Sequence, residues 1–525
     1  MTAKNYFLNY NPVTGEEIGK YSIPSQSEII KAKKSATEAS QFWKDSSFSK
    51  RSELLKEIRK KIIANLTELI ETICLDTGKV QLEALMADIY PSLEILYYYE
   101  KNLADILQPE KRKTPLTALG NKSWVEYYPR GVVAIISPWN YPFQLSLVPI
   151  ITAIAAGNAV IYKPSEETPL TGEKIADLFA DITRLPSGLL QIIQGPGEVG
   201  KGLIESGPDM IFFTGSVATG KKIMAQAAKK LIPVELELGG KDPFIVLKDA
   251  PLARAATGAV YGAFANTGQL CVGAERFYVQ EEIAEEFKEL VKEKTKELRV
   301  NQGPKGDIGP LTTPQQKNKI IEQIEEALAK GANIIEPDNF TSSLHDNNIS
   351  REEAYPAEIQ PVILDNLEED LKILQEETFG PVMPILTFSS VDEVIQRANN
   401  SHLGLNSSVW SKDRQLARRV ARELETGNCM INDVIKNVGN PYLPFGGVKM
   451  SGIGRYHGPE GLKNFSNTKS IMLNKSQAEK ELNWFPFKEE VYQDLKTYLE
   501  NYYGDRSLLE KISGTIPLLL RFLKG

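Results

Sequence analysis

Residues 131–163, GVVAIISPWNYPFQLSLVPIITAIAAGNAVIYK, decide the fold class of this chain. The two short apolar runs at 131–137 and 158–163 predict strands, and the longer apolar segment between them predicts a helix over 144–156. Continuous apolar runs of this length are typical of parallel strands that are covered on both faces. The stretch therefore predicts one βαβ unit of a parallel sheet.

The alternation of strands and helices continues beyond this unit. Apolar runs at 189–194, 210–215 and 233–238 predict three more strands, and helices are predicted over 171–182 and 219–230. This order is typical of a parallel sheet with helices on both faces. The predicted fold class is therefore α/β.

The sequence patterns before and after this region differ from each other. Over 26–110, apolar residues recur at three- and four-residue spacing, which predicts amphipathic helices. From about 240 to 450, strands and helices alternate again, with a helix expected over 281–298. Because 525 residues are too many for one ordinary core, two or three domains are expected.

Composition argues against several classes of protein. The 61 basic and 68 acidic side chains give a net charge of −7 with no long basic run, so no nucleic-acid partner is expected. Three cysteines cannot form a disulfide framework, and three scattered histidines argue against a zinc site or a Ser-His-Asp triad. There is no signal-peptide pattern and no run of 18 apolar residues. A soluble cytoplasmic protein is expected.

The segment GQLCVGAER at 268–276 places one of the three cysteines in unusual surroundings. A buried cysteine commonly serves as a small hydrophobic side chain. Cys271 instead lies between glycines and near Arg276, in a setting that suits a nucleophile. The cysteine alone does not decide between these two roles.

Two further motifs carry polar groups next to predicted strands. In SPWNYPF at 137–143, two prolines stiffen the loop around Asn140, whose uncharged amide suits an oxyanion; a turn hydrogen bond is the alternative. In VELELGGK at 234–241, Glu235 and Glu237 share one face of a strand, where a buried acid is costly unless it is used or paired. An exposed salt bridge is the alternative for either acid.

Two glycine-containing turns are candidate phosphate sites. GPGEVG at 195–200 matches GxGxxG but follows a late strand of the unit, so a tight turn beside a cofactor is favoured over a pyrophosphate cradle. FTGSVATG at 213–220 runs from a strand into a helix, where backbone N–H groups and Ser216 can bind a phosphate. A plain turn capped by Ser216 is the alternative.

Taken together, these segments resemble the aldehyde dehydrogenase superfamily over about residues 5–475. Seven motifs in the same order carry the resemblance: SPWNYPF (137–143), KPSE (163–166), FTGSVATG (213–220), ELELGGK (235–241), GQLCVGAER (268–276), EETFGPV (376–382) and PFGGVKMSGIGR (444–455). The spacing between Glu237 and Cys271 also resembles that of the family. Within it, SSFSKR, GAERFYV and the long C-terminal extension look most like the plant family twenty-two branch.

The resemblance implies a reaction and its catalytic residues. Cys271 is expected to attack an aldehyde, and Asn140 with the backbone N–H of Cys271 to hold the oxyanion. After hydride transfer to the cofactor, Glu237 is expected to activate the water that hydrolyses the thioester. The implied function is NAD(P)-dependent oxidation of an aldehyde to a carboxylic acid, without transfer to coenzyme A. A non-catalytic cofactor-binding scaffold of the same fold is the alternative.

The resemblance also implies a nicotinamide dinucleotide site and no metal. The residues implied in this site are Trp139, Lys163, Ser165, Glu166, Gly215, Ser216, Thr219, Gly220, Glu377 and Phe379. A carboxylate at Glu166 that accepts from both ribose hydroxyls repels a 2′-phosphate. NAD is therefore expected to be preferred, with NADP as the other candidate.

The resemblance implies a division of the chain. Its parts are a Rossmann-type cofactor domain in 1–110 and 130–239, an α/β catalytic domain in 240–450, a bridging β segment in 111–129 and 460–475, and a C-terminal extension in 476–525. A bridging sheet with free edges needs a cover, so a homodimer or a dimer of dimers is expected. The insertion at 341–355 is expected to be a surface loop, and Tyr456 stands where many relatives have an acid.

The C-terminal extension ends in TIPLLLRFLKG at 515–525, which is too short to span a membrane. Its apolar residues, with Arg521 and Lys524, suit packing on a subunit, which we favour, or peripheral contact with a membrane surface. We expect this extension to bias the enzyme toward apolar or long-chain aldehydes.

Overall fold

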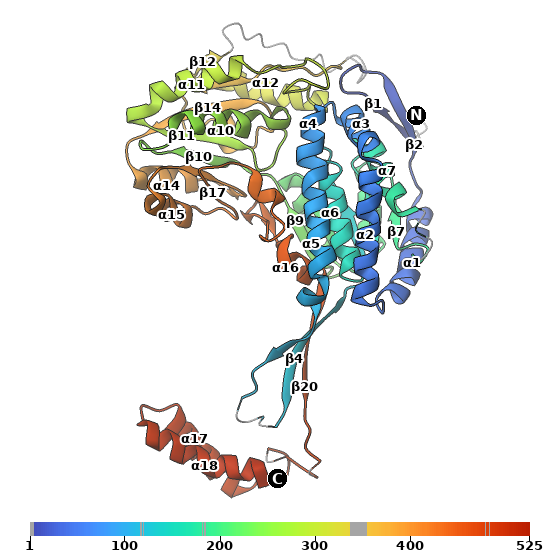
Figure 1. The fold of residues 1–525 in the computed structure, drawn as a ribbon, viewed down its shortest axis with the longest axis vertical. Coiled ribbons are helices and arrows are strands. Elements are labelled where there is room, and N and C mark those ends of the chain that lie inside the picture. The colour runs from blue at the N-terminus through green and yellow to red at the C-terminus, as the bar shows by residue number, and fades with distance from the viewer. Residues whose placement is uncertain are drawn as a thin grey trace. The chain divides into compact units, whose positions relative to one another are not determined.

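The computed structural model describes residues 5–115, 118, 120–180, 182, 185–336, 354–477, 479–481 and 483–524. The chain forms two compact units, one of Met1–Leu107 with Tyr128–Asn467 and one of Gln108–Tyr127 with Thr468–Gly525. Most of the expected surface loop at 341–355 lies outside the described residues. Figure 1 shows both units, with the elements labelled.

The stretch that predicts the fold class forms β5 (Val132–Ile136), α6 (Gln144–Ala155) and β6 (Ala159–Lys163). β5 and β6 are parallel neighbours, with Val132 opposite Ala159. Every residue of these three elements is buried, which is why their sequence is continuously apolar. The prediction of a βαβ unit is confirmed to within two residues at each boundary.

These strands belong to a six-stranded sheet with the order β19-β9-β8-β5-β6-β7. Its other strands are β7 (Leu190–Ile192), β8 (Met210–Thr214), β9 (Val234–Glu237) and β19 (Gly452–Ile453). The helices that connect the parallel strands are α7 (Pro169–Ala180), α8 (Gly197–Glu205) and α9 (Val217–Ala228). Strand β19 is antiparallel to β9 and places Gly452 opposite Glu237, so a distant segment closes over the end of β9.

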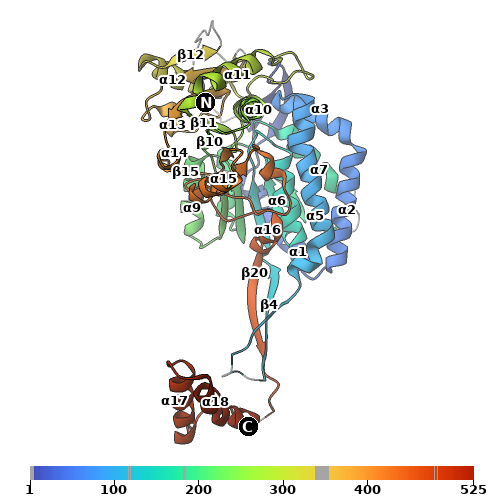
Figure 2. The same cartoon turned by 60° about the vertical axis from the view of Figure 1, so that its left-hand side comes forward.

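The N-terminal region packs beside this sheet. It consists of β1 (Tyr6–Tyr10), β2 (Glu17–Ser22), α1 (Gln26–Trp43), α2 (Phe48–Ala64), α3 (Leu66–Thr77), α4 (Gln81–Glu83), a π-helical turn (Ala84–Ile89) and α5 (Tyr90–Leu107). Helix α1 begins at a capping box made by Ser25 and Glu28. The indole of Trp43 donates to the carbonyl of Ile154 at 2.8 Å and ties α1 to α6. Figures 1 and 2 show α2, α5 and α6 side by side.

A second sheet of seven strands has the order β12-β13-β14-β11-β10-β16-β17. Its strands are β10 (Asp242–Val246), β11 (Ala274–Gln280), β12 (Asn333–Glu336), β13 (Val362–Asp365), β14 (Val382–Phe388), β16 (Ser408–Trp410) and β17 (Met430–Ile431). All neighbouring strands are parallel except β12 and β13. Its core includes the fully buried Ile245, Tyr278 and Leu364.

The helices around the second sheet confirm the α/β alternation expected after residue 240. They are α10 (Leu252–Phe264), α11 (Ala284–Lys296), α12 (Pro314–Ala329), α13 (Lys372–Gln375), α14 (Val391–Asn399) and α15 (Arg414–Glu423). The expected helix at 281–298 is a short 3-10 turn, Glu281–Ile283, followed by α11. A small antiparallel pair, β15 (Leu403–Gly404) and β18 (Val448–Lys449), follows in the same unit.

The smaller unit contains most of a three-stranded sheet and two helices. Its strands are β3 (Glu110–Arg112), β4 (Lys122–Pro129) and β20 (Ser466–Leu473), in the order β20-β4-β3, and β20 follows α16 (Gly458–Asn464) of the larger unit. The helices α17 (Glu489–Tyr502) and α18 (Leu508–Lys524) pack against each other. In the part of the chain that the structure describes, no helix is long and apolar enough to cross a membrane.

Candidate active site

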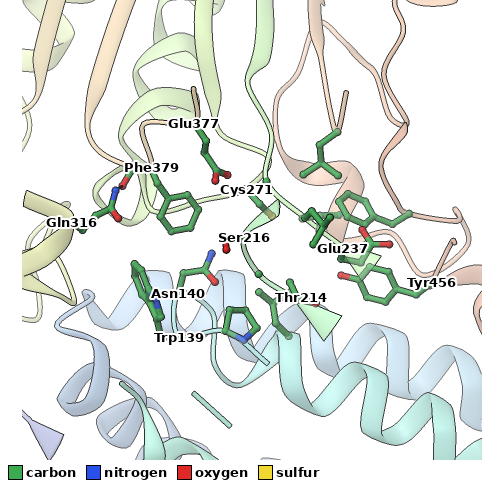
Figure 3. A pocket seen from close by; sticks show the side chains of 18 of the residues that line it. Trp139, Asn140, Thr214, Ser216, Glu237, Cys271, Gln316, Glu377, Phe379 and Tyr456 are labelled. Atoms are coloured by element: carbon green, nitrogen blue, oxygen red, sulfur yellow. Dashed lines mark hydrogen bonds between the residues drawn. The ribbon is translucent and has the colours of Figure 1, made fainter. Parts of the chain in front are cut away.

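A cavity of about 220 Å³ opens in the larger unit. It lies beyond the carboxyl ends of β5, β8 and β9 and close to the starts of β10 and β11, where α/β sheets commonly bind ligands. All three residues expected to be catalytic, Asn140, Glu237 and Cys271, line this cavity. Figure 3 shows Cys271 between Glu377 and Phe379 on one side and Glu237 and Tyr456 on the other.

The loop that carries Cys271 is fixed by its backbone. Asn266 and Thr267 adopt positive φ of 49° and 60° in the 3-10 turn that follows α10. Gly268, at φ 72°, lies so close to the carbonyl of Gly380 that a Cβ would come within 2.1 Å of its oxygen. Only glycine therefore fits at this position, three residues before the thiol.

The electrostatic surroundings of Cys271 favour the protonated thiol. Burial raises the pKa of the thiol, and the nearby carboxyls of Glu377, Asp242 and Glu237 raise it further. A nucleophilic thiolate therefore needs a base or a positive charge that arrives with a ligand.

A buried ion pair positions the Asn140 loop. Lys79 Nζ lies 2.6 Å from Asp88 Oδ2 and donates to the backbone carbonyl of Asn140 at 2.7 Å. The other carboxylate oxygen of Asp88 accepts from the backbone N–H groups of Phe143 and Gln144, at the start of α6. The pair thus holds the middle of the loop and its junction with α6.

The Asn140 side chain is held ready for a ligand. Its amide nitrogen donates to the carbonyl of Gln269 at 3.0 Å, which links it to the Cys271 loop. An amide carries two N–H donors, so one remains for an oxyanion next to Cys271. This arrangement favours the oxyanion role over a simple turn hydrogen bond for Asn140.

Glu237 is the last residue of β9 and is only 4% exposed. Neither of its carboxylate oxygens has a hydrogen-bond partner among the described residues. Burial raises its pKa well above the ordinary value, and Glu235 adds to this, whereas Arg455 opposes it. An unpaired acid that lines the same cavity as a thiol suits a general base. Because Glu237 is buried, the alternative of an exposed salt bridge does not apply to it.

Glu235 shares the face of β9 with Glu237 and is fully buried. One carboxylate oxygen accepts from the side-chain amide of Asn464, and the other has no partner among the described residues. Burial raises its pKa to about 8, while the Asn464 hydrogen bond and the charges of Arg130 and Arg455 act in the opposite direction. Glu235 also forms no exposed salt bridge.

The expected cofactor residues fall into two groups. The first group lines the cavity and consists of Trp139, Gly215, Ser216, Glu377 and Phe379. The second group lies outside the cavity lining: Lys163, Ser165 and Glu166 are at the end of β6, and Thr219 and Gly220 are in the first turn of α9. Ser216 caps α9 by accepting from the N–H of Thr219 at 3.3 Å. Lys163 Nζ lies 3.2 Å from Glu166 Oε2. Burial lowers the pKa of Lys163, and the Glu166 carboxylate partly offsets this.

A second buried ion pair builds the loop that carries Glu377 and Phe379. Lys241 Nζ lies 2.6 Å from Glu275 Oε2 and donates to Thr378 Oγ1 at 2.9 Å. The two oxygens of Glu275 accept from the backbone N–H groups of Thr378 and Phe379. Phe379 is held at a φ of 57°, with its ring 5.6 Å from that of Trp139 in an edge-to-face arrangement.

Two side chains that hold the Glu377–Phe379 loop were not predicted from the sequence. Gln316 of α12 donates to the carbonyls of Thr378 and Phe379 at 2.7 and 3.1 Å, and Lys319 donates to that of Glu377 at 2.6 Å. Both side chains line the cavity. Their spacing of three residues on one helix was the available signal, since it places them on the same face.

The cavity fits the charged ring of an oxidised nicotinamide. The carboxyls of Glu237 and Glu377 lie around Cys271, and burial raises the pKa of both. A cationic ring would offset the negative charge of these carboxyls, and the rings of Trp139 and Phe379 offer aromatic contacts. The start of α9 supplies N–H groups of the kind that bind phosphate. Within the described ranges, no group of three His, Cys, Asp or Glu side chains is placed to hold a metal ion.

Comparison with known proteins gives consistent matches. The sequence model described as "Aldehyde dehydrogenase family" matches residues 1–471. A 4,4'-diapolycopene aldehyde oxidase from a Methylomonas species is 44% identical over 502 residues, which cover 95% of this chain and 92% of the relative. Neither match supports the finer placement with the plant family twenty-two branch.

Solved structures confirm the fold expected from the sequence. Betaine aldehyde dehydrogenase of Staphylococcus aureus in complex with NAD+ is 32% identical with a TM-score of 0.83, covering 92% of this chain and 94% of that chain. The NAD+ complex of an aldehyde dehydrogenase from Bacillus cereus is 31% identical with a TM-score of 0.83, covering 90% and 94%.

Proposed function

This chain belongs to the aldehyde dehydrogenase family, and we propose that it is an NAD-preferring enzyme that oxidises apolar aldehydes to carboxylic acids and releases them by hydrolysis. The observation that carries the proposal is the convergence of the Cys271 thiol, the Asn140 amide and the unpaired Glu237 carboxyl on one cavity. A scaffold that only binds a cofactor would not need an unpaired buried acid, which destabilises the fold.

The three side chains divide the reaction between them. The thiolate of Cys271 adds to the aldehyde carbon, and the Asn140 amide stabilises the negative oxygen that results. NAD supplies the hydride acceptor, and a thioester on Cys271 remains. Glu237 then takes a proton from water as the water attacks the thioester, which frees the acid and the Cys271 thiolate.

We propose that Glu377 and Phe379 hold the nicotinamide ribose, and that Lys163 and Glu166 hold the adenosine ribose. The first pair lies on the loop fixed by Glu275, and the second pair lies at the end of β6. The six-stranded sheet with its N-terminal helices then corresponds to the cofactor domain, and the seven-stranded sheet to the catalytic domain.

Cofactor choice tests the role of Glu166. The Glu166 carboxylate is only 35% exposed and is held beside Lys163, so it cannot easily move away from a 2′-phosphate that it repels. We therefore expect kcat/KM to be about tenfold or more higher with NAD than with NADP. Glu166→Gln removes the charge that repels a 2′-phosphate and is expected to narrow this ratio, while Glu167→Gln, the neighbouring acid, is expected to leave it unchanged. Equal kcat/KM values for the two cofactors in the unmodified enzyme would contradict the assignment.

The aldehyde side of the cavity supports an apolar substrate. Leu145, Leu238, Leu405, Val438 and Phe445 line it. The loop with Val438 continues to Tyr442 and Leu443, which are 67% and 50% exposed. The same loop passes α5, where the Gly439 backbone lies close to Pro91. The relative named for a diapolycopene aldehyde also favours a long apolar substrate.

The C-terminal extension supplies further exposed apolar surface. Leu508, Ile512, Ile516 and Leu520 recur at four-residue spacing along α18, each at least 46% exposed. The side chains of residues 521–524, including Arg521 and Lys524, lie outside the described residues. We propose that this stripe is covered by a second subunit of a homodimer or larger assembly, with peripheral membrane contact as the alternative, in a cytoplasmic protein.

Truncation after residue 475 tests the link between this extension and substrate choice. The shortened chain keeps β20 but lacks α17 and α18. We expect kcat/KM for long-chain aldehydes to fall by about tenfold, equivalent to ~1.4 kcal/mol of lost interaction, while that for short aldehydes persists. The assay uses a panel from short aliphatic to long polyene aldehydes, with assembly followed by light scattering. An unchanged chain-length profile in a soluble, still assembled truncation would exclude this role.

A further inference from the structure

Three buried carboxyl oxygens without a partner face one side of β9. They are Oε1 of Glu235 and both side-chain oxygens of Glu237, and no described cation forms an ion pair with either acid. Residues two apart on a strand lie on the same face, with Cβ atoms roughly 6–7 Å apart. Carboxyls at neighbouring positions on one face of a strand can share a bridging water, and buried polar groups that lack a protein partner commonly bind water.

The backbone of two glycines lies close to the side chains of Glu235 and Glu237. A Cβ at Gly454 would lie 2.9 Å from Cγ of Glu235, and one at Gly446 would lie 3.0 Å from Oε1 of Glu237. Both glycines belong to the segment around β19 that closes over the end of β9. Main chain at Gly446 and Gly454 therefore lies directly against the two acids.

Of the two acids, Glu237 faces the cavity and Glu235 lies on the side toward the protein surface. Glu237 lines the cavity with Cys271, whereas Glu235 accepts from Asn464 of α16. The carbonyl of Asn464 in turn accepts from Arg130 Nε at 2.9 Å, and both Asn464 and Arg130 are partly exposed. Polar groups thus lead from Glu235, the neighbour of the candidate base, to partly exposed side chains.

We propose that Glu235 accepts the proton that Glu237 removes from the hydrolytic water and passes it to the solvent past Asn464. This inference rests on the proposed dehydrogenase function and assigns a role to an acid that does not itself touch the substrate. Glu235 therefore acts through Glu237.

The proton transfers balance at each step. Water gives one proton to the Glu237 carboxylate as its oxygen bonds to the thioester carbon, and the C–S bond breaks to release the Cys271 thiolate. The protonated Glu237 then gives a proton to a bridging water, which gives one to the Glu235 carboxylate. Glu235 finally releases a proton to bulk water, so both carboxylates are restored for the next turnover.

The charges around Glu235 come from several elements. Its titratable and charged neighbours are Glu237 on β9, Arg130 before β5, Arg455 and Tyr456 after β19, and Tyr99 on α5. Burial raises the pKa of Glu235 to about 8, so its proton-accepting form increases as the pH rises through this value. Wild-type turnover limited by hydrolysis is therefore expected to rise with pH, with a midpoint near 8.

The test is Glu235→Gln, which keeps an acceptor for Asn464 but cannot carry the proton. We expect steady-state kcat to fall by about tenfold, with the first-turnover formation of NADH and kcat/KM for the aldehyde unchanged, because both report steps that precede hydrolysis. The pH limb of kcat should move to lower pH, because loss of the neighbouring carboxylate lowers the pKa of Glu237. Glu235→Asp restores a carboxylate and is expected to recover part of the lost kcat.

Other results would overturn the inference. If Glu235 only repels Glu237, Glu235→Gln moves the pH limb without lowering the plateau of kcat. If Glu235 is only structural, both Glu235→Gln and Glu235→Asp lose thermal stability and the pH limb stays in place. A normal first turnover in Glu235→Gln shows that the dehydrogenase function stands in either case, whereas no first turnover in the unmodified enzyme would refute that function itself.

Discussion

Cys271→Ala is expected to lower aldehyde-dependent NADH formation by roughly 10⁴-fold or more, because an alanine methyl group cannot form the covalent adduct with the aldehyde. NAD binding, measured by the shift in melting temperature on adding the cofactor, is expected to persist. The side chain of Cys271 contributes little to the ribose and phosphate contacts proposed for the cofactor, so its removal should leave these intact.

The other two cysteines serve as matched controls. Cys74 and Cys429 do not line the cavity with Cys271, and Cys429 packs against the core of the second sheet. Cys74→Ala and Cys429→Ala are expected to keep nearly full turnover. Substantial activity in Cys271→Ala would refute the nucleophile, and NAD binding without turnover in the unmodified enzyme across all aldehydes would support the scaffold alternative.

Glu237→Gln is expected to separate the two halves of the reaction. Steady-state turnover should fall by about 100- to 1000-fold, because the amide cannot take a proton from the water that attacks the thioester. The first turnover should be spared more, so rapid mixing is expected to show a burst of NADH followed by slow release. The unpaired carboxyl oxygens of Glu237 make this a clean substitution, since no described hydrogen bond is lost.

The amplitude of the burst decides the interpretation of Glu237→Gln. A burst close to one NADH per active site places the loss in thioester hydrolysis. Equal losses in the burst and the steady state would show that Glu237 chiefly activates Cys271, or that the cavity has collapsed. The melting temperature of the variant separates these two outcomes.

The fold was predictable where burial imposes a simple pattern. β5, β6 and β8 are covered on both faces, so their sequences are continuous apolar runs whose ends lie within one residue of the strand ends. β19 was not predicted, because a two-residue strand leaves no periodic pattern and its pairing with β9 depends on the tertiary fold. The catalytic residues could be recognised in the sequence because each lies in an unusual local context. Cys271 lies between glycines, Asn140 lies between two prolines, and Glu237 precedes a Gly-Gly pair.

The side chains that position the catalytic loops could not be predicted from the sequence, for a different reason. Lys241 and Glu275 both lie in motifs that the sequence singles out, but their ion pair exists only because β10 and β11 are parallel neighbours. Lys79 and Asp88 belong to a helical region recognised by its apolar face alone, so their contact with the Asn140 loop left no signal. Side chains that act by holding another segment are invisible until that segment is placed.

The loop of Glu377 and Phe379 has a consequence for how the cofactor exchanges. Glu275 accepts from the backbone N–H groups of Thr378 and Phe379, and these contacts within the chain hold Phe379 in a left-handed conformation. Because contacts within the chain already order this loop, ordering it is expected to contribute little to the entropy of cofactor binding. Association of the dinucleotide is then a docking of rigid surfaces, for which a single exponential phase with a rate proportional to cofactor concentration is expected.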